Sequence, residues 1–205
     1  MIEVSEQTLD RMHTLLAGIQ DADQKVLKPA FTRGLMAGKT EAGKVVRKTY
    51  HISPADFKDR GFLKYNAVTE SGSGIIGSLV YSGAVIPLIK FKVNPDTPKN
   101  QKTPSAAVLR SSGLVSFSNK KNVFVAQMKS GHIGVFERQD NKYSKKRGSG
   151  RNKHTEALKE LLSPAVPQMV GNEIVMQTVE ERVNEVINNR INHEIDRLLD
   201  KQGGK

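Results

Sequence analysis

The chain has 205 residues and a formal net charge of +11, with 37% hydrophobic residues, 5% aromatic residues, no tryptophan and no cysteine. The absence of cysteine excludes disulfide bonds, thiolate catalysis and zinc sites built from thiolates. The low hydrophobic and aromatic content predicts a modest, aliphatic core, and we expect much of the burial to come from neighbouring subunits.

The N-terminal segment MIEVSEQTLDRMHTLL is acidic and amphipathic, so it lacks the basic and then apolar pattern of a signal peptide. No apolar run approaches the roughly 20 residues that cross a bilayer. We therefore expect a soluble protein with no membrane partner, made in a reducing cytoplasm.

The positive charge is concentrated in the middle of the chain. Residues 1–24 hold five acids and one base, residues 25–172 hold 26 bases and nine acids, and residues 173–205 hold seven acids and five bases. A basic middle segment predicts contact with polyanions or with acidic protein surfaces. The alternative is a solvated positive surface that only maintains solubility.

The N-terminal part of the sequence is helical in pattern. Apolar residues at helical spacing predict a short amphipathic helix over 6–19 and a longer helix over about 23–50. Pro29 should kink the longer helix or mark its true start. Ser53, followed by proline, is typical of a helix N-cap and predicts a short helix that ends at Arg60.

From residue 62 to residue 138 the pattern changes to short apolar, β-branched runs separated by turn residues. These runs are FLKYNAVT, IIGSLVYS, AVIPLIKF, AAVLR, LVSF, NVFVAQM and HIGVFER. Strands that follow one another without intervening helices predict an antiparallel sheet. The proline-rich segment 92–104 and the basic segment 139–154 are predicted to be long exposed loops, which in compact domains are usually functional or disordered.

The C-terminal part is again helical in pattern. Residues 155–171 predict a short helix and a proline-containing connection, and after Asn172 apolar spacings of three and four predict a helix of about 28 residues, roughly 42 Å long. Such a helix should dock along a sheet or a neighbouring subunit. Coiled-coil dimerisation is the alternative, although Asn184 and Arg190 break a strict heptad.

These patterns predict an α+β fold in which a mainly antiparallel β-sheet is flanked by a long N-terminal helix and a long C-terminal helix. We expect one domain over 1–205. Its predicted parts are a helical part (1–60), a β-part (61–138), a basic loop (139–154) and a C-terminal helical part (155–201).

Three sequence features are only weak indications of a binding site. GSGIIG (72–77) matches a dinucleotide-binding pattern, but it leads into a β-like segment and not into a helix, so hairpin glycines explain it better. The five histidines show no metal-ligand spacing, and no metal or other cofactor is expected. Glu180, Glu181 and Glu185 suit a hard cation, but a solvated helix face that pairs with Arg182 and Arg190 is the better interpretation.

The stretch GHIGVFERQ (131–139) raises the question of an active site, with His132 as base and Glu137 and Arg138 as its partners. In a strand, side chains alternate between faces, so Glu137 and Arg138 cannot both point into one pocket without a bulge. We interpret the stretch as a framework strand with a polar edge.

The basic loop is the candidate contact site. It could bind phosphate without reading sequence, although it offers only one aromatic residue for stacking. Ordering against an acidic partner is the alternative. The residues expected to contact DNA or an acidic partner are Lys142, Lys145, Lys146, Arg147, Arg151 and Lys153.

Three uncommon sequence segments follow one another along the chain, and we call them phrases. They are VIPLIKF (85–91), FVAQMKSGHIGVFERQ (124–139) and LLSPAVPQMVGNEIVMQTVEERVNEVINNRINHEIDRLL (161–199). In these phrases the chain resembles the prophage minor tail protein Z family, the tail-completion proteins of bacteriophages with long, non-contractile tails. The resemblance covers about residues 25–199. No role is carried over to the loops at 92–104 and 139–154.

The resemblance implies a structural part of the virion and not an enzyme. It implies a place at the head-proximal end of the tail, in tail assembly and head–tail joining, with tail terminator, tail tube and head–tail connector proteins as partners. It further implies a homo-hexameric ring, synthesis in the bacterial host and possible contact with genome DNA in the channel. The alternatives are a non-sequence-specific nucleic-acid-binding protein and, from GSGIIG and the histidines alone, a nucleotide-dependent enzyme or hydrolase.

Overall fold

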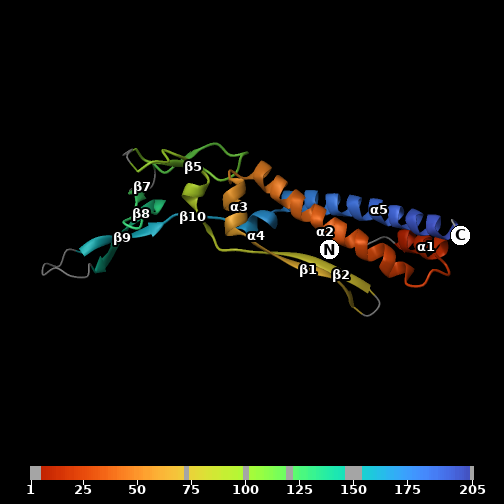
Figure 1. The fold of residues 1–205 in the computed structure, drawn as a ribbon. Coiled ribbons are helices and arrows are strands. Elements are labelled where there is room, and N and C mark those ends of the chain that lie inside the picture. Colours follow the sequence, from red (N-terminus) through yellow and green to blue (C-terminus); the bar gives the residue numbers. More distant parts are fainter. Residues whose placement is uncertain (1–5, 72–73, 99–101, 119–121, 146–153, 204–205) are drawn as a thin grey trace. The chain divides into compact units, whose positions relative to one another are not determined.

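A computed structural model describes residues 6–71, 74–98, 102–118, 122–145 and 154–203 of the chain (Figure 1). Contacts within the chain group it into two compact units, each made of separate segments. Unit 1 consists of Met1–Val46, Phe62–Ser82 and Val170–Lys205, and unit 2 consists of Arg47–Gly61 and Gly83–Met169.

Unit 1 is built on two long helices and a hairpin. Its elements are α1 (Glu6–Leu15), α2 (Ala22–Thr49, whose last residues belong to unit 2), β1 (Phe62–Ser71), β2 (Gly74–Ser82) and α5 (Glu173–Gly203). The predicted helices over 6–19, 23–50 and the C-terminal segment are confirmed. Pro29 lies inside α2, so it does not mark the start of the helix.

Helices α2 and α5 lie side by side and antiparallel (Figure 1). Four small residues of α2, spaced by four, face α5 and are buried: Ala30, Gly34, Gly38 and Ala42. Because residues four apart share one helix face, this row lets the two backbones approach closely. Val183 and Ile187 of α5 fill the space that the two glycines leave.

The core of unit 1 continues to the far end of the helix pair. Met12 and Leu16, at the C-terminal end of α1, join a buried cluster with Val26 of α2 and Ile191 of α5. Aliphatic burial of this kind contributes roughly 1.5–3 kcal/mol for each large side chain. Burying α1 and α2 against one stripe of α5 thus explains why a helix with so many polar residues is stable.

The β1–β2 hairpin holds the GSGIIG motif. Strand β1 pairs with β2 in antiparallel register, with Phe62 opposite Ser82 and Ser71 opposite Gly74. Within the described residues, the motif therefore leads into a strand and not into a helix, as the sequence predicts. The geometry that places a pyrophosphate at a helix N-terminus is not formed.

Unit 2 contains the remaining strands, all paired antiparallel where they are described. Its elements are α3 (Pro54–Arg60), β3 (Ile86–Pro87), η1 (Leu88–Lys90), β4 (Lys92–Asn94), β5 (Ser105–Ala107), β6 (Val115–Ser116), β7 (Val123–Gln127), β8 (Ile133–Lys145), β9 (His154–Glu160), β10 (Leu162–Ser163) and α4 (Val166–Val170). Two three-stranded sheets, β4–β5–β6 and β7–β8–β9, accompany the short β10–β3 pair. The α+β class predicted from the sequence is confirmed.

The core of unit 2 is aliphatic, as the composition predicts. It is formed by Leu88, Val93, Ala106, Val123, Val125 and Val135. Helix α3 begins as predicted, because the Ser53 hydroxyl accepts a hydrogen bond from the Asp56 amide at 3.0 Å. Such N-caps stabilise a helix by about 1 kcal/mol.

Several predicted boundaries are corrected. The basic loop predicted over 139–154 is largely strand where it is described, because β8 extends to Lys145 and β9 begins at His154. The short helix predicted within 155–171 does not lie at the start of that range, because 154–160 pair with β8; the helix there is α4 (Val166–Val170). The run AVIPLIKF forms only a two-residue strand followed by a 3-10 turn, and the predicted loop 92–104 begins with strand β4.

Candidate functional site

The net positive charge of the chain lies in unit 2. Unit 2 holds 20 basic and seven acidic residues, a net +13, whereas unit 1 holds 12 basic and 14 acidic residues, a net −2. The sequence alone shows a basic middle segment, but it does not show that helix α2 and the β1–β2 hairpin belong with the near-neutral unit. The structure therefore makes unit 2 the candidate polyanion-binding surface.

Two of the six predicted contact residues lie on the described part of β8. Lys142 falls where the β8–β9 register shifts, between Gln139 and Tyr143, and Lys145 is the register partner of His154. A shift of this kind inserts extra residues on one strand and bends the ladder. Lys146, Arg147, Arg151 and Lys153 lie outside the described residues.

Most of the GHIGVFERQ stretch forms the start of β8, and its histidine, just before the strand, is paired with a side chain of β9. His132 Nε2 lies 2.7 Å from Glu160 Oε1 of β9, and not beside Glu137. Gly134 makes room for this pair, because a β carbon there would stand 2.6 Å from the same Glu160 oxygen. His132 is thus paired with a carboxylate from a neighbouring strand, and the interpretation of this stretch as a framework strand remains the preferred one.

The same face of β8 is aromatic and basic. Phe136 lies opposite Phe124 in the β7–β8 ladder, with 6.4 Å between the ring centroids. The Arg138 guanidinium lies 5.0 Å from the centre of the Phe124 ring, a cation–π arrangement. Because side chains alternate, Val135 points the other way, into the core of unit 2. On this face Phe136 is itself buried, Phe124 is half-buried and Arg138 is exposed, so the sheet presents charge over a largely covered aromatic pair.

A second basic group in unit 2 was not predicted from the sequence. Arg110 lies against the C-terminal end of α2, where its Nε donates to the carbonyl oxygens of Arg47 at 2.7 Å and Tyr50 at 3.2 Å. A cation at this position offsets the negative end of the helix dipole. Burial lowers the pKa of His51, and the charges of Arg110 and Lys92 lower it further.

The protonated form of His51 is disfavoured in this environment, first by burial and then by the two neighbouring cations, which together lower its pKa. His51, Lys92 and Arg110 are far apart in the sequence, and no local pattern connects them. They are brought together because the His51 amide donates to the Val108 carbonyl at 2.8 Å and Tyr50 forms an isolated bridge with Leu109. This group of one histidine and two cations therefore cannot be recognised from the sequence alone.

Other candidate sites are not assembled in the part of the chain that the structure describes. That part contains no group of three or more histidine, aspartate or glutamate side chains placed to hold a metal ion. On α5, Glu185 instead pairs with Arg182 at 2.6 Å. Among the described helices, none combines the length and the apolar character required to span a bilayer.

Comparison with protein families, with curated proteins and with solved structures finds no match for this chain.

Proposed function

We propose that this is a structural tail-completion or neck protein of a long-tailed bacteriophage, acting at the head-proximal end of the tail in tail assembly and head–tail joining. In this proposal the protein acts by shape and charge and not by catalysis. Copies form a ring, most simply a hexamer, next to the tail terminator, tail tube and connector proteins. Unit 2 faces either the genome in the channel or an acidic surface of a neighbouring protein.

The observation that carries the proposal is the separation of charge between the units. A net +13 in unit 2 creates a strong positive potential, which attracts DNA phosphates or acidic protein rings. Unit 1, with a net of −2, supplies long helices that suit a scaffold. One chain thus contains a strongly basic unit and a near-neutral helical unit.

The setting of the proposal comes from the resemblance of the phrases at 85–91, 124–139 and 161–199 to the prophage minor tail protein Z family. All three segments contain elements of the fold. The first contains β3 and η1, the second contains most of β7 and the start of β8, and the third contains β10, α4 and most of α5. The resemblance therefore involves both units.

A second candidate function is a free, non-sequence-specific nucleic-acid-binding protein. The same basic unit favours it, and Arg138 over Phe124 adds a charged aromatic surface. This function requires affinity for free DNA that falls steeply with salt, because counterions are released on binding. A tail-completion protein does not require that affinity at physiological salt.

Native mass spectrometry at low and moderate salt, with and without short duplex DNA, separates the two functions. A hexamer without DNA supports the tail-completion proposal. A monomer or dimer that forms a salt-sensitive DNA complex favours the nucleic-acid-binding protein. A monomer that binds no DNA would contradict ring formation by the purified chain and would also contradict the nucleic-acid-binding function.

Charge reversal on β8 then tests the contact surface. Lys142→Glu with Lys145→Glu should weaken DNA binding and reduce the slope of log K against log salt by about two. The matched control, Lys39→Glu with Lys201→Glu, makes the same charge change on exposed positions of unit 1. Equal weakening by both pairs would contradict a localised contact surface on unit 2.

A further inference from the structure

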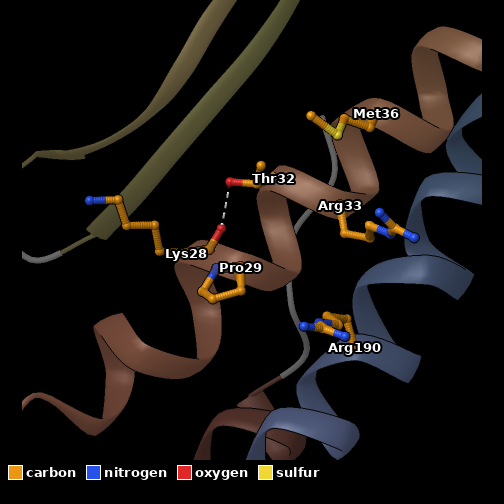
Figure 2. A pocket seen from close by; sticks show the side chains of 6 residues that line it. All are labelled: Lys28, Pro29, Thr32, Arg33, Met36 and Arg190. Carbon is orange, nitrogen blue, oxygen red and sulfur yellow. Dashed lines mark hydrogen bonds between the residues drawn. The ribbon is translucent and has the colours of Figure 1, made fainter.

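A shallow groove follows the α2–α5 helix pair within unit 1. One part, with a volume of about 490 Å³, is lined by Lys28, Pro29, Thr32, Arg33, Met36 and Arg190 (Figure 2). Arg33 and Met36 also line a second part of about 340 Å³, so the two parts are continuous. We call this surface the α2–α5 groove. From Lys28 to Lys44 it spans roughly 24 Å, at 1.5 Å per helical residue.

The groove is distinct from the surface of α2 that faces the hairpin. Phe31, Leu35 and Gly38 line an apolar cavity together with Leu79 of β2. Arg33 and the other groove residues of α2 occupy different positions of the helical repeat and present another face. The hairpin therefore leaves the groove uncovered in unit 1.

The groove is basic. One acidic residue, Glu41, lines it. The five basic residues that line it are Lys28, Arg33, Lys44, Arg182 and Arg190. Figure 2 shows Arg33 and Arg190 reaching into the space between the two helices, while Lys28 is directed away from α5 at the rim.

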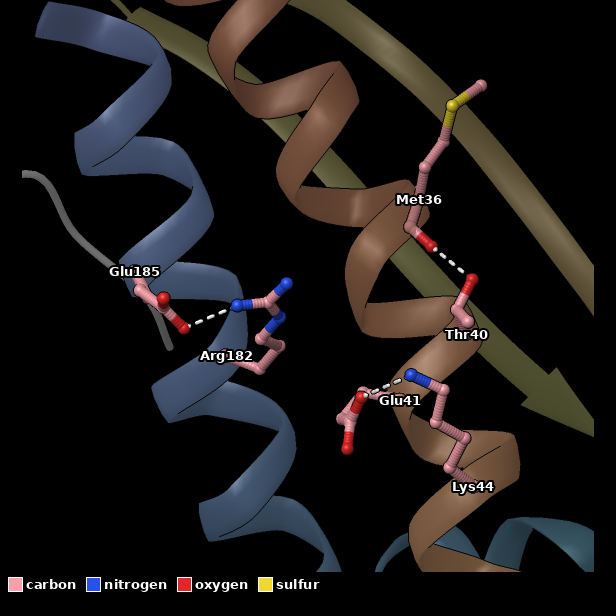
Figure 3. Close-up of polar contacts among 6 residues, drawn as sticks. All are labelled: Met36, Thr40, Glu41, Lys44, Arg182 and Glu185. Atoms are coloured by element: carbon pink, nitrogen blue, oxygen red, sulfur yellow. Dashed lines mark hydrogen bonds and ion pairs between the residues drawn. The ribbon is translucent and has the colours of Figure 1, made fainter.

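Some of these charges are already compensated within the chain. Lys44 pairs with Glu41 at 3.3 Å, and Arg182 pairs with Glu185 at 2.6 Å (Figure 3). Arg190 shares the Glu194 carboxylate with Arg197. Lys28 and Arg33 have no ion-pair partner among the described residues.

Apolar side chains also line the groove. The Met36 side chain is 51% exposed although it lies at the junction of the two parts. Pro29 lines the first part and Val186 the second. Flexible methionine side chains adapt to the side chains of a bound partner. The groove thus combines apolar side chains with cations, and Arg33 stands beside Met36 where the two parts meet.

We propose that the α2–α5 groove binds an amphipathic acidic helix of a partner protein. Carboxylates on that helix would meet Arg33, Lys28 and the net positive Arg190–Glu194–Arg197 group, and its apolar residues would cover Met36 and Val186. A helix laid between two helices uses the same packing that holds α2 against α5. The groove accommodates about 16 residues of such a helix.

Two other occupants fit the groove less well. Nucleic acid backbone would meet the cations, but it would leave Met36 and Val186 against charged phosphates, and unit 2 carries far more positive charge. The acidic helix of a second copy, α1, already buries its apolar residue Met12 in its own core. The inference does not depend on the proposed tail function.

The test is fluorescence anisotropy with the full chain and a labelled peptide of about 16 residues, the length that matches the groove. The peptide carries leucines at i, i+3, i+4 and i+7, and glutamates on the remaining faces. One control peptide replaces the leucines with serine, and another replaces the glutamates with lysine. We expect the acidic amphipathic peptide to bind and both control peptides to bind at least about tenfold more weakly.

Protein variants locate the site. Arg33→Glu should weaken the binding of the acidic peptide about tenfold, and Met36→Ser should weaken it separately because the apolar contact is lost. Lys39→Glu reverses a charge on the same helix outside the groove and should leave the affinity unchanged. Circular dichroism checks that each variant remains folded.

The proposal is overturned by failure of the acidic peptide to bind, or by equal binding of the serine peptide, which would indicate simple polyanion attraction. Equal weakening by Lys39→Glu would also overturn it. Displacement of the peptide by short duplex DNA from the wild-type chain, with loss of DNA binding in Arg33→Glu, would assign the groove to nucleic acid instead.

Discussion

Gly34 of α2 lies directly against Ile187 of α5, so closely that a β carbon on residue 34 would stand 2.5 Å from Ile187 Cγ1. Gly38, one turn later, is in the same position relative to Val183, at 2.7 Å. Real β carbons do not approach other atoms this closely, so the absence of a side chain determines the distance between the helices. This contact explains why a long helix has glycines in its interior, where each costs about 1 kcal/mol relative to alanine.

Gly34→Ala should destabilise unit 1 by about 1–3 kcal/mol despite the better helix propensity of alanine, because the methyl group overpacks the interface with Ile187. Urea unfolding followed by circular dichroism measures the change in unfolding free energy. In a double-mutant cycle, Ile187→Ala removes the atoms that collide with the new methyl group. The double variant should therefore be less destabilised than the sum of the single variants. Strict additivity would contradict the close contact.

The helices were predictable because their signals are long and local. The spacing of Val183, Ile187 and Ile191 on α5 shows the helical period over many turns, and Ser53–Pro54 marks the start of α3. TEALKEL (155–161) predicts a helix because it contains good helix formers, but most of these residues form strand β9. Pairing with β8 overrides that propensity. Such tertiary pairing has no signature within the segment itself.

Glu194 is only 1% exposed and lies between Arg190 and Arg197 on α5. Glu194→Gln should destabilise the protein by about 1–3 kcal/mol, because two arginines lose one buried, charge-assisted partner. The arginines remain partly solvated, which keeps the loss below that of a fully buried pair. The same measurement on Glu185→Gln, whose carboxylate is 57% exposed beside Arg182, should show a change below about 0.5 kcal/mol. Similar losses for both variants would contradict a special role for burial.

The candidate site was predictable only in outline. The basic composition of the middle segment predicted a polyanion contact, and Lys142 and Lys145 do lie in the basic unit. The grouping of Lys92 and Arg110 around His51 depends on backbone pairing between distant segments. Charge counts along a sequence carry no information about such pairing.

Asp56 should make unit 2 less stable in acid. Burial alone would raise the pKa of this carboxyl, but hydrogen bonds from Ser53 and Lys90 and the charges of Lys90 and Arg60 bring it below the ordinary value of 3.8. A carboxyl with a lowered folded-state pKa contributes stability above its unfolded-state pKa and loses it as pH falls through the folded-state value.

The unfolding free energy of the wild-type chain should therefore decline as pH falls below about 4, and Asp56→Asn should weaken that decline and cost about 1 kcal/mol at neutral pH. Lys90 Nζ lies 2.9 Å from Asp56 Oδ1, and this contact is what the variant removes. Asp59→Asn, on an exposed residue of the same helix, is the control. An identical pH profile for Asp56→Asn and wild type would exclude this contribution.

His51 should report on anion binding in unit 2. Burial and the charges of Arg110 and Lys92 lower its pKa below 6.5, so the unfolded chain binds a proton more readily and stability falls as pH drops through that value. His51→Gln should flatten this part of the stability profile.

A phosphate bound near Arg110 and Lys92 would offset their charges, and the pKa of His51 should then rise when short duplex DNA is added. NMR titration of the histidine signals measures this, with the exposed His193 of α5 as internal reference. DNA binding without movement of the His51 pKa would place the contact on another part of unit 2, whereas a rise confined to His51 would locate phosphate beside Arg110.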